Sequence, residues 1–141
     1  MKQRVWLYPI LLILSYFIGV LLFRGAHFVL NIDERSEYHL LYPGIIAFYI
    51  FLITPLYIII TYVFRSVLKK HSILLLTIIL IIIGFLPSLL VPFFGGMGFG
   101  YLNVNYFGSE MAILLYSFYT GSAIAFSLGS TIIERMLQQK L

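Results

Sequence analysis

Four long runs of apolar residues dominate the sequence and leave little chain for anything else. An α-helix needs roughly 20 consecutive apolar residues to cross the hydrocarbon core of a bilayer, and each run is about that long or longer. A helix also satisfies its own backbone hydrogen bonds, which lipid cannot do for it. We therefore predict an all-α membrane protein, a single transmembrane domain over residues 1–141 with four spans at about residues 5–30, 40–64, 72–94 and 110–133.

Composition excludes a water-soluble domain and several kinds of chemistry. Hydrophobic residues make up 62% of the chain and charged residues only 10%, too few to cover a soluble core. The absence of cysteine excludes disulfides, thiol catalysis and cysteine-based metal sites. Histidines are scattered over both predicted sides of the membrane, and we expect no metal, no cofactor and no catalytic residues. The net charge of +4 arises at helix ends rather than in a basic stripe, so we expect no nucleic-acid partner.

The distribution of basic residues predicts how the spans face. One predicted side has only Arg24 and Arg35, together with four of the five acidic residues. The opposite side has the other seven basic residues, Lys2, Arg4, Arg65, Lys69, Lys70, Arg135 and Lys140. By the positive-inside rule, we predict an up-down bundle with both termini and the basic hinge at residues 65–71 in the cytoplasm. The residue usage fits a multi-pass protein of the bacterial cytoplasmic membrane, surrounded by membrane lipids.

Proline interrupts two of the predicted spans. Pro55 lies inside the second span, where its missing N–H frees a carbonyl one turn earlier and predicts a bend. Pro87 and Pro92 are expected to break or kink the far end of the third span.

Small residues recur every four positions along the fourth span, at Ser117, Gly121, Ala125 and Gly129. This spacing places them on one helix face. Helices in lipid associate through close backbone approach and van der Waals contact, which small residues permit. We favour packing of this face against the first or second span inside the bundle. A homo-oligomer or partner interface is the alternative.

A polar cluster is predicted near the external membrane edge. Arg24 and His27 are three residues apart and share a face if the first helix continues that far. Glu110, at the start of the fourth span, is expected at the same depth. The simpler interpretation is an arginine that snorkels to the headgroups beside an interfacial histidine. The alternative is an Arg24–Glu110 ion pair of functional importance.

The second external loop, residues 95–109, combines glycines with aromatic residues and contains no charge. We expect it to cap the outer end of the bundle, and partner recognition is its functional alternative. The residues that would contact a partner are Phe99, Tyr101, Asn103, Asn105 and Tyr106.

Three function classes remain, and we favour a non-enzymatic one. The first is binding of a partner protein or peptide in or above the bilayer, as by an accessory subunit or an immunity-type protein, and it fits the small-residue stripe and the uncharged loop. The second is a transporter or channel subunit for a small molecule or ion, suggested by the proline breaks. The third is a lipid-modifying enzyme. Such an enzyme needs a cluster of His, Asp or Glu side chains at one membrane interface, and the sequence offers few candidates there.

Overall fold

The computed structural model describes residues 6–32, 41–67, 72–92 and 104–138. All the secondary structure in these ranges is helical. The elements are α1 (Leu7–Val29), α2 (Leu41–Phe48), η3 (Tyr49–Ile53), α3 (Thr54–Tyr62), η4 (Val63–Val67), α4 (Ile73–Pro92), η6 (Tyr106–Gly108) and α5 (Glu110–Gln138).

Four helical segments are long and apolar enough to cross a membrane. They are Leu7–Val29, Tyr42–Ser66, Ile73–Val91 and Glu110–Met136. The second of these joins α2, η3, α3 and η4 into one rod. The sequence-based prediction of an all-helical chain with four membrane-length helices is thus confirmed.

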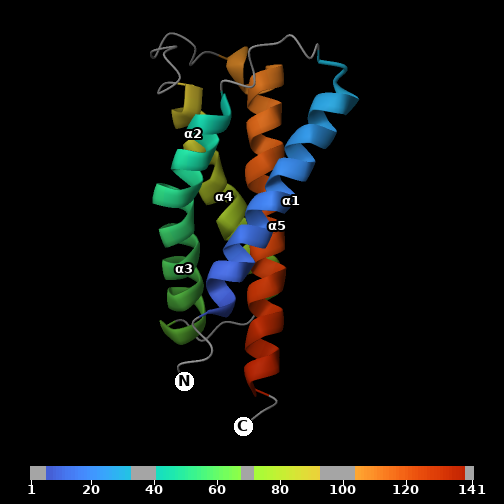
Figure 1. The fold of residues 1–141 in the computed structure, drawn as a ribbon. Helices are drawn as coiled ribbons and strands as arrows, with labels where there is room; N and C mark the ends of the chain where they lie inside the picture. Colours follow the sequence, from blue (N-terminus) through green and yellow to red (C-terminus); the bar gives the residue numbers. More distant parts are fainter. Residues whose placement is uncertain (1–5, 33–40, 68–71, 93–103, 139–141) are drawn as a thin grey trace.

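Helix α5 occupies the centre of the arrangement. In its most apolar window 56% of the residues are buried inside the protein, compared with 28% in each of the other three segments. Figure 1 shows α1 crossing obliquely over α5, with α4 behind and the α2–α3 rod on the other side. The start of α1 and the end of α5 lie at the same end of the molecule (Figure 1). The other helices therefore build their shared core on α5.

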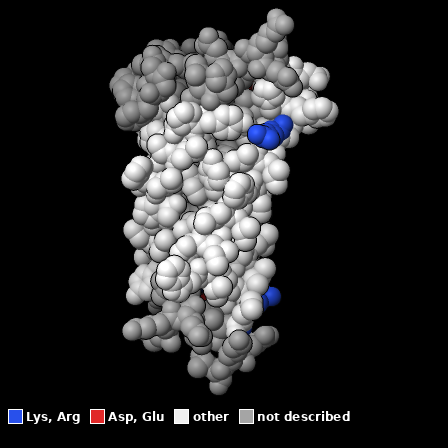
Figure 2. Space-filling model, viewed as in Figure 1, with Lys and Arg blue, Asp and Glu red and all other residues white. Residues whose placement is uncertain are grey.

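Charged side chains are confined to the two ends of the described structure. The face in Figure 2 is uncharged along most of its length, with arginine visible only toward its ends. Exposed aliphatic and aromatic side chains cover the middle of α1, including Ile13, Phe17 and Leu21. An apolar exterior of this extent is the surface that lipid, rather than water, solvates.

Local backbone chemistry sets the helix ends. After α1 the backbone of Asn31 turns into the left-handed region, with φ at 50°. There the N–H groups of Asn31 and Ile32 bond the carbonyls of Phe28 and His27, which is the hydrogen-bond pattern of a Schellman motif. The hydroxyl of Ser109 accepts a bond from the N–H of Ala112, at 3.2 Å, and caps α5.

A π-helical turn, η3, accommodates Pro55. Because Pro55 has no N–H, it cannot continue the regular hydrogen-bond ladder. The chain widens just before it, and the N–H of Thr54 bonds the carbonyl of Tyr49, five residues back. Tyr49 and Ile53 of this turn are both buried. The wider turn therefore keeps its large side chains in the core.

Helix α1 packs directly against the backbone of α5 at Gly19. A Cβ atom added there would lie 2.9 Å from the backbone oxygen of Phe118 and 2.9 Å from its ring. A backbone atom cannot swing away, so only glycine fits. Cβ atoms at Gly121 and Gly129 would instead meet the flexible ends of Leu22 and Leu11.

Hydroxyl groups join the helices inside the core. The hydroxyl of Tyr49 donates to the Leu12 carbonyl, at 2.8 Å, and lies 2.5 Å from the Ser15 hydroxyl. The hydroxyls of Tyr57 and Ser122 are 3.1 Å apart and connect α3 with α5. A third pair, formed by Thr77 of α4 and Ser127 of α5, is 2.6 Å apart. These bonds fix which helix faces meet, since an apolar surface alone does not choose between them in lipid.

We expect Gly19→Ala to destabilise the protein, by about 1–3 kcal/mol for an overpacked contact. The added methyl group would force α1 away from the backbone of α5. Thermal unfolding in detergent, followed by circular dichroism, measures the effect. Gly25→Ala is the matched control, because a Cβ there meets nothing within 4 Å. Equal melting temperatures for the two variants would contradict this account of the α1–α5 contact.

Candidate functional site

A groove opens between α1 and α5 where the two helices diverge. It has a volume of about 440 Å³. Its lining, which we call the α1–α5 groove, consists of Leu22, Gly25, Ala26, Ile113, Tyr116, Ser117 and Thr120. Gly25 has open space where a side chain would be. Backbone is therefore accessible on the α1 side of the groove.

Two hydroxyls of this groove have no hydrogen-bond partner among the described residues, those of Tyr116 and Thr120. Ser117 differs, because its hydroxyl donates to the carbonyl of Ile113 at 2.8 Å. At the helical rise of 1.5 Å per residue, Tyr116 lies about 9 Å and Thr120 about 15 Å along α5 from Glu110. In a hydrocarbon layer of roughly 30 Å that began at Glu110, Thr120 would lie near the middle.

The small-residue stripe of the fourth span lies along the α1 side of α5. Gly121 packs under Leu22, and Gly129 packs under Leu11. Ser117 lines the groove, and Ala125 is half-buried. The stripe on the fourth span did not point to Gly19, although Ser15 and Gly19 of the first span are themselves two small residues four positions apart.

Two residues of the predicted membrane-edge cluster, Arg24 and His27, belong to α1, and the third, Glu110, begins α5. Arg24 and Glu110 are both exposed, and His27 is half-buried. Arg24 and Glu110 do not pair with each other: within the described parts of the chain, the ion pair joins Arg65 to Glu134.

Part of the predicted partner loop is described. Phe99, Tyr101 and Asn103 lie outside the described residues, while Asn105 is exposed. Tyr106 is buried in η6, and its hydroxyl donates to the Ser88 carbonyl at 2.6 Å. Tyr106 thus fastens this segment to α4.

Sequence reasoning did not anticipate the Arg65 clamp, by which we mean Arg65 together with its partners on α5. Arg65 lies in the π-helical turn η4 and forms an ion pair of 2.5 Å with Glu134. Its other terminal nitrogen donates to the hydroxyls of Ser130 and Thr131, at 3.1 and 2.7 Å. The Ser130 carbonyl also accepts a bond from Arg65, at 2.9 Å. The side chains of Arg65 and Glu134 are only 10% and 23% exposed.

A signal for this clamp was present in the sequence. Ser130, Thr131 and Glu134 are three and four residues apart, which places them on one face of α5. Arg65 was counted only as one of the basic residues that set orientation, although it directly continues an apolar run. Charges at such positions are costly unless paired, and a partner was therefore to be expected.

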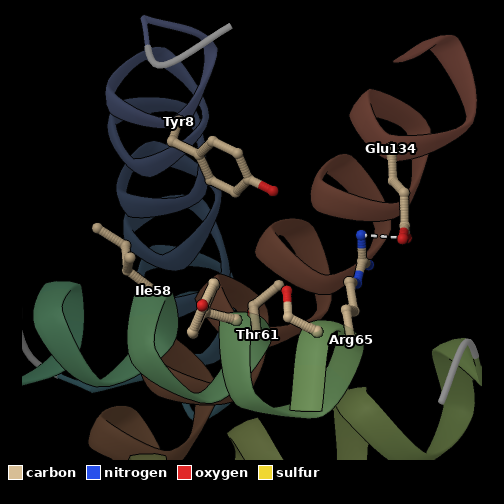
Figure 3. A pocket seen from close by; sticks show the side chains of 7 residues that line it. Tyr8, Ile58, Thr61, Arg65 and Glu134 are labelled. Atoms are coloured by element: carbon tan, nitrogen blue, oxygen red, sulfur yellow. Dashed lines mark ion pairs between the residues drawn. The ribbon is translucent and has the colours of Figure 1, made fainter. Parts of the chain in front are cut away.

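A pocket of about 280 Å³ lies beside the clamp. This Arg65 pocket is lined by Tyr8, Ile58, Thr61, Tyr62, Arg65, Ser66 and Glu134. Figure 3 shows the labelled side chains arranged around it from three parts of the chain, α1, the α3–η4 rod and α5. The hydroxyl of Thr61 is buried and has no hydrogen-bond partner among the described residues. Leaving such a group unsatisfied costs about 1–3 kcal/mol.

No family model matches the chain, and comparison with curated proteins and with solved structures likewise gives no match.

We expect Arg65→Met to destabilise the fold by about 3 kcal/mol, because it leaves the Glu134 carboxylate in place without its guanidinium partner. The double variant Arg65→Met/Glu134→Met should recover much of this loss, since no charge then remains. Thermal unfolding of the two single variants and the double variant measures the coupling. Arg24→Gln, which removes an exposed arginine at the other end, serves as control. Additive effects of the two substitutions would show that the ion pair does not stabilise the fold.

Proposed function

We propose that this chain is a small integral protein of the bacterial cytoplasmic membrane that acts non-enzymatically, by binding a transmembrane helix of a partner protein. The α1–α5 groove is the site of binding. The observation that carries this proposal is the accessible backbone at Gly25 beside the hydroxyl-bearing side chains of Tyr116 and Thr120, which have no hydrogen-bond partner among the described residues.

Close approach supports a helix as the occupant. A partner helix gains contact energy in lipid only where small residues let backbones come together. The groove offers Gly25 and Ala26 on one wall and Ser117 on the other. Its length along α5, from Ile113 to Thr120, is about two helical turns. This matches the contact length of two crossing helices.

Unmet polar groups favour a protein over an acyl chain. A hydroxyl in hydrocarbon gains when it finds a hydrogen-bond partner. A lipid tail offers none to Tyr116 or Thr120. A partner helix with a serine, threonine, asparagine or glutamine side chain at this depth supplies one.

We further propose how the chain is oriented in the membrane, and hence on which side of it the groove lies. Seven basic residues at one end and two at the other favour cytoplasmic termini and an up-down bundle. The groove then belongs to the outer half of the membrane, since it lies on the Glu110 half of α5.

Single-cysteine labelling tests this orientation, and the chain has no native cysteine to remove. We expect Val104→Cys to react with a membrane-impermeant maleimide on intact cells, because this position is exposed at the proposed outer end. Met136→Cys, exposed at the other end, should react only after permeabilisation. The reverse pattern would mean that the termini face outward.

Photo-crosslinking tests the groove. A benzophenone amino acid at Tyr116 keeps the first aromatic ring of the native side chain, adds a photoreactive benzoyl group that extends into the groove, and should give a covalent adduct with one protein of defined mass. The same group at Phe17, which is 58% exposed on α1 outside the groove, should react only with lipid. Mass spectrometry of the adducts distinguishes these outcomes.

Gly25→Leu provides the matching loss-of-binding variant. The leucine fills the groove without meeting another residue at its Cβ, so the fold should persist while the adduct disappears. An adduct with twice the mass of the chain would instead identify a second copy as the occupant. Lipid adducts alone at both positions would refute the proposal.

A further inference from the structure

The Arg65 pocket lies at the level of the membrane boundary and is separate from the α1–α5 groove. Tyr8 is the second residue of α1, Arg65 is the last but one residue of the segment Tyr42–Ser66, and Glu134 lies two residues before the end of Glu110–Met136. These three side chains line one pocket at the end of the molecule where α1 begins and α5 ends (Figures 1 and 3). In a membrane this end of the spans lies among the lipid headgroups.

The pocket presents one fixed cation and one fixed anion. The Arg65 clamp holds the guanidinium through four contacts to α5, so its position is set before any ligand arrives. Those contacts use the two terminal nitrogens, and Nε–H has no partner among the described residues. The pair has no net charge. A ligand that is itself neutral but carries both charges complements it, whereas a purely anionic or cationic ligand meets one like charge.

The remaining walls suit an amphiphile. Ile58 and the rings of Tyr8 and Tyr62 give the pocket an apolar side. Tyrosine rings next to a carboxylate recognise an ammonium group through cation–π and ionic attraction. The volume of about 280 Å³ lies below the range of about 300–1,000 Å³ typical of sites for drug-sized molecules. A pocket of this volume can hold a phospholipid headgroup while the acyl chains of the lipid remain outside it.

We propose that the Arg65 pocket binds the headgroup of a zwitterionic phospholipid. The phosphate lies toward Arg65, and the ammonium group lies toward Glu134 and the tyrosine rings. The acyl chains leave along Ile58 into the hydrocarbon. The buried hydroxyl of Thr61, which has no hydrogen-bond partner among the described residues, adds a polar group to this site.

Native mass spectrometry of the full chain in detergent tests the proposal. Phosphatidylethanolamine and phosphatidylglycerol with identical acyl chains are titrated separately, because the first headgroup is zwitterionic and the second anionic. We expect the wild-type protein to bind phosphatidylethanolamine about tenfold more tightly, the factor expected from one charge-assisted hydrogen bond. Equal binding, or a preference for phosphatidylglycerol, would overturn the proposal.

Two variants locate the preference. Glu134→Gln removes the anion and should reverse the order, so that phosphatidylglycerol binds better. Glu110→Gln removes a carboxylate at the opposite end and should leave the order unchanged. The same shift in both variants would mean that net charge, not this pocket, decides binding.

A third variant keeps the test decisive if Glu134→Gln does not fold. Tyr8→Leu retains an apolar side chain and all charges but removes the ring. It should weaken binding of phosphatidylethanolamine about tenfold, the upper range expected for a partly desolvated cation–π contact, while phosphatidylglycerol binding stays the same. Soluble phosphoethanolamine is added in competition. Displacement of the lipid at equal concentration would show that the pocket recognises the free molecule, and the lipid assignment would be wrong.

Discussion

The close packing of α1 on α5 is the contact on which the rest of the structure depends. Hydrophobicity does not hold helices together in lipid, because lipid tails are as apolar as leucine. What remains is contact at short range, and Gly19 against the backbone of Phe118 provides it. With α1 placed on one side of α5 and α4 on the other, the α2–α3 rod completes the arrangement.

Hydrogen bonds between polar side chains connect the helices within this largely apolar protein. Tyr49, Tyr57 and Thr77 each pair with a hydroxyl of a different segment, so the tyrosines of the spans do more than fill space. A hydrogen bond of this kind is directional, and it selects one rotation of a helix among many that would bury equal area. The Arg65 clamp extends the same principle to charge at the end of the bundle.

The two proposed sites lie where the interhelical hydrogen bonds and packing contacts leave space between the helices. Helices α1 and α5 cross at an angle, so contact at Gly19 is accompanied by divergence further along, and the groove at Gly25 follows. At the other end, the clamp draws η4 to α5 while Tyr8 of α1 stays across the Arg65 pocket. Each site is therefore a consequence of how the helices cross.

The sequence by itself determined the class of the protein and its four membrane-length helices. Helix length, apolarity and the capping chemistry of Asn31 and Ser109 are local properties that a single segment carries. The small-residue repeat was visible in the sequence, but which span it faces was left open; in the structure Gly121 lies against Leu22 and Gly129 against Leu11 of α1. Only the tertiary structure decided that Gly19 lies against the backbone of Phe118 and that Arg65 meets Glu134, because each depends on how two distant segments are rotated toward each other. The same holds for the groove and the pocket, whose lining residues come from different helices and share no sequence pattern.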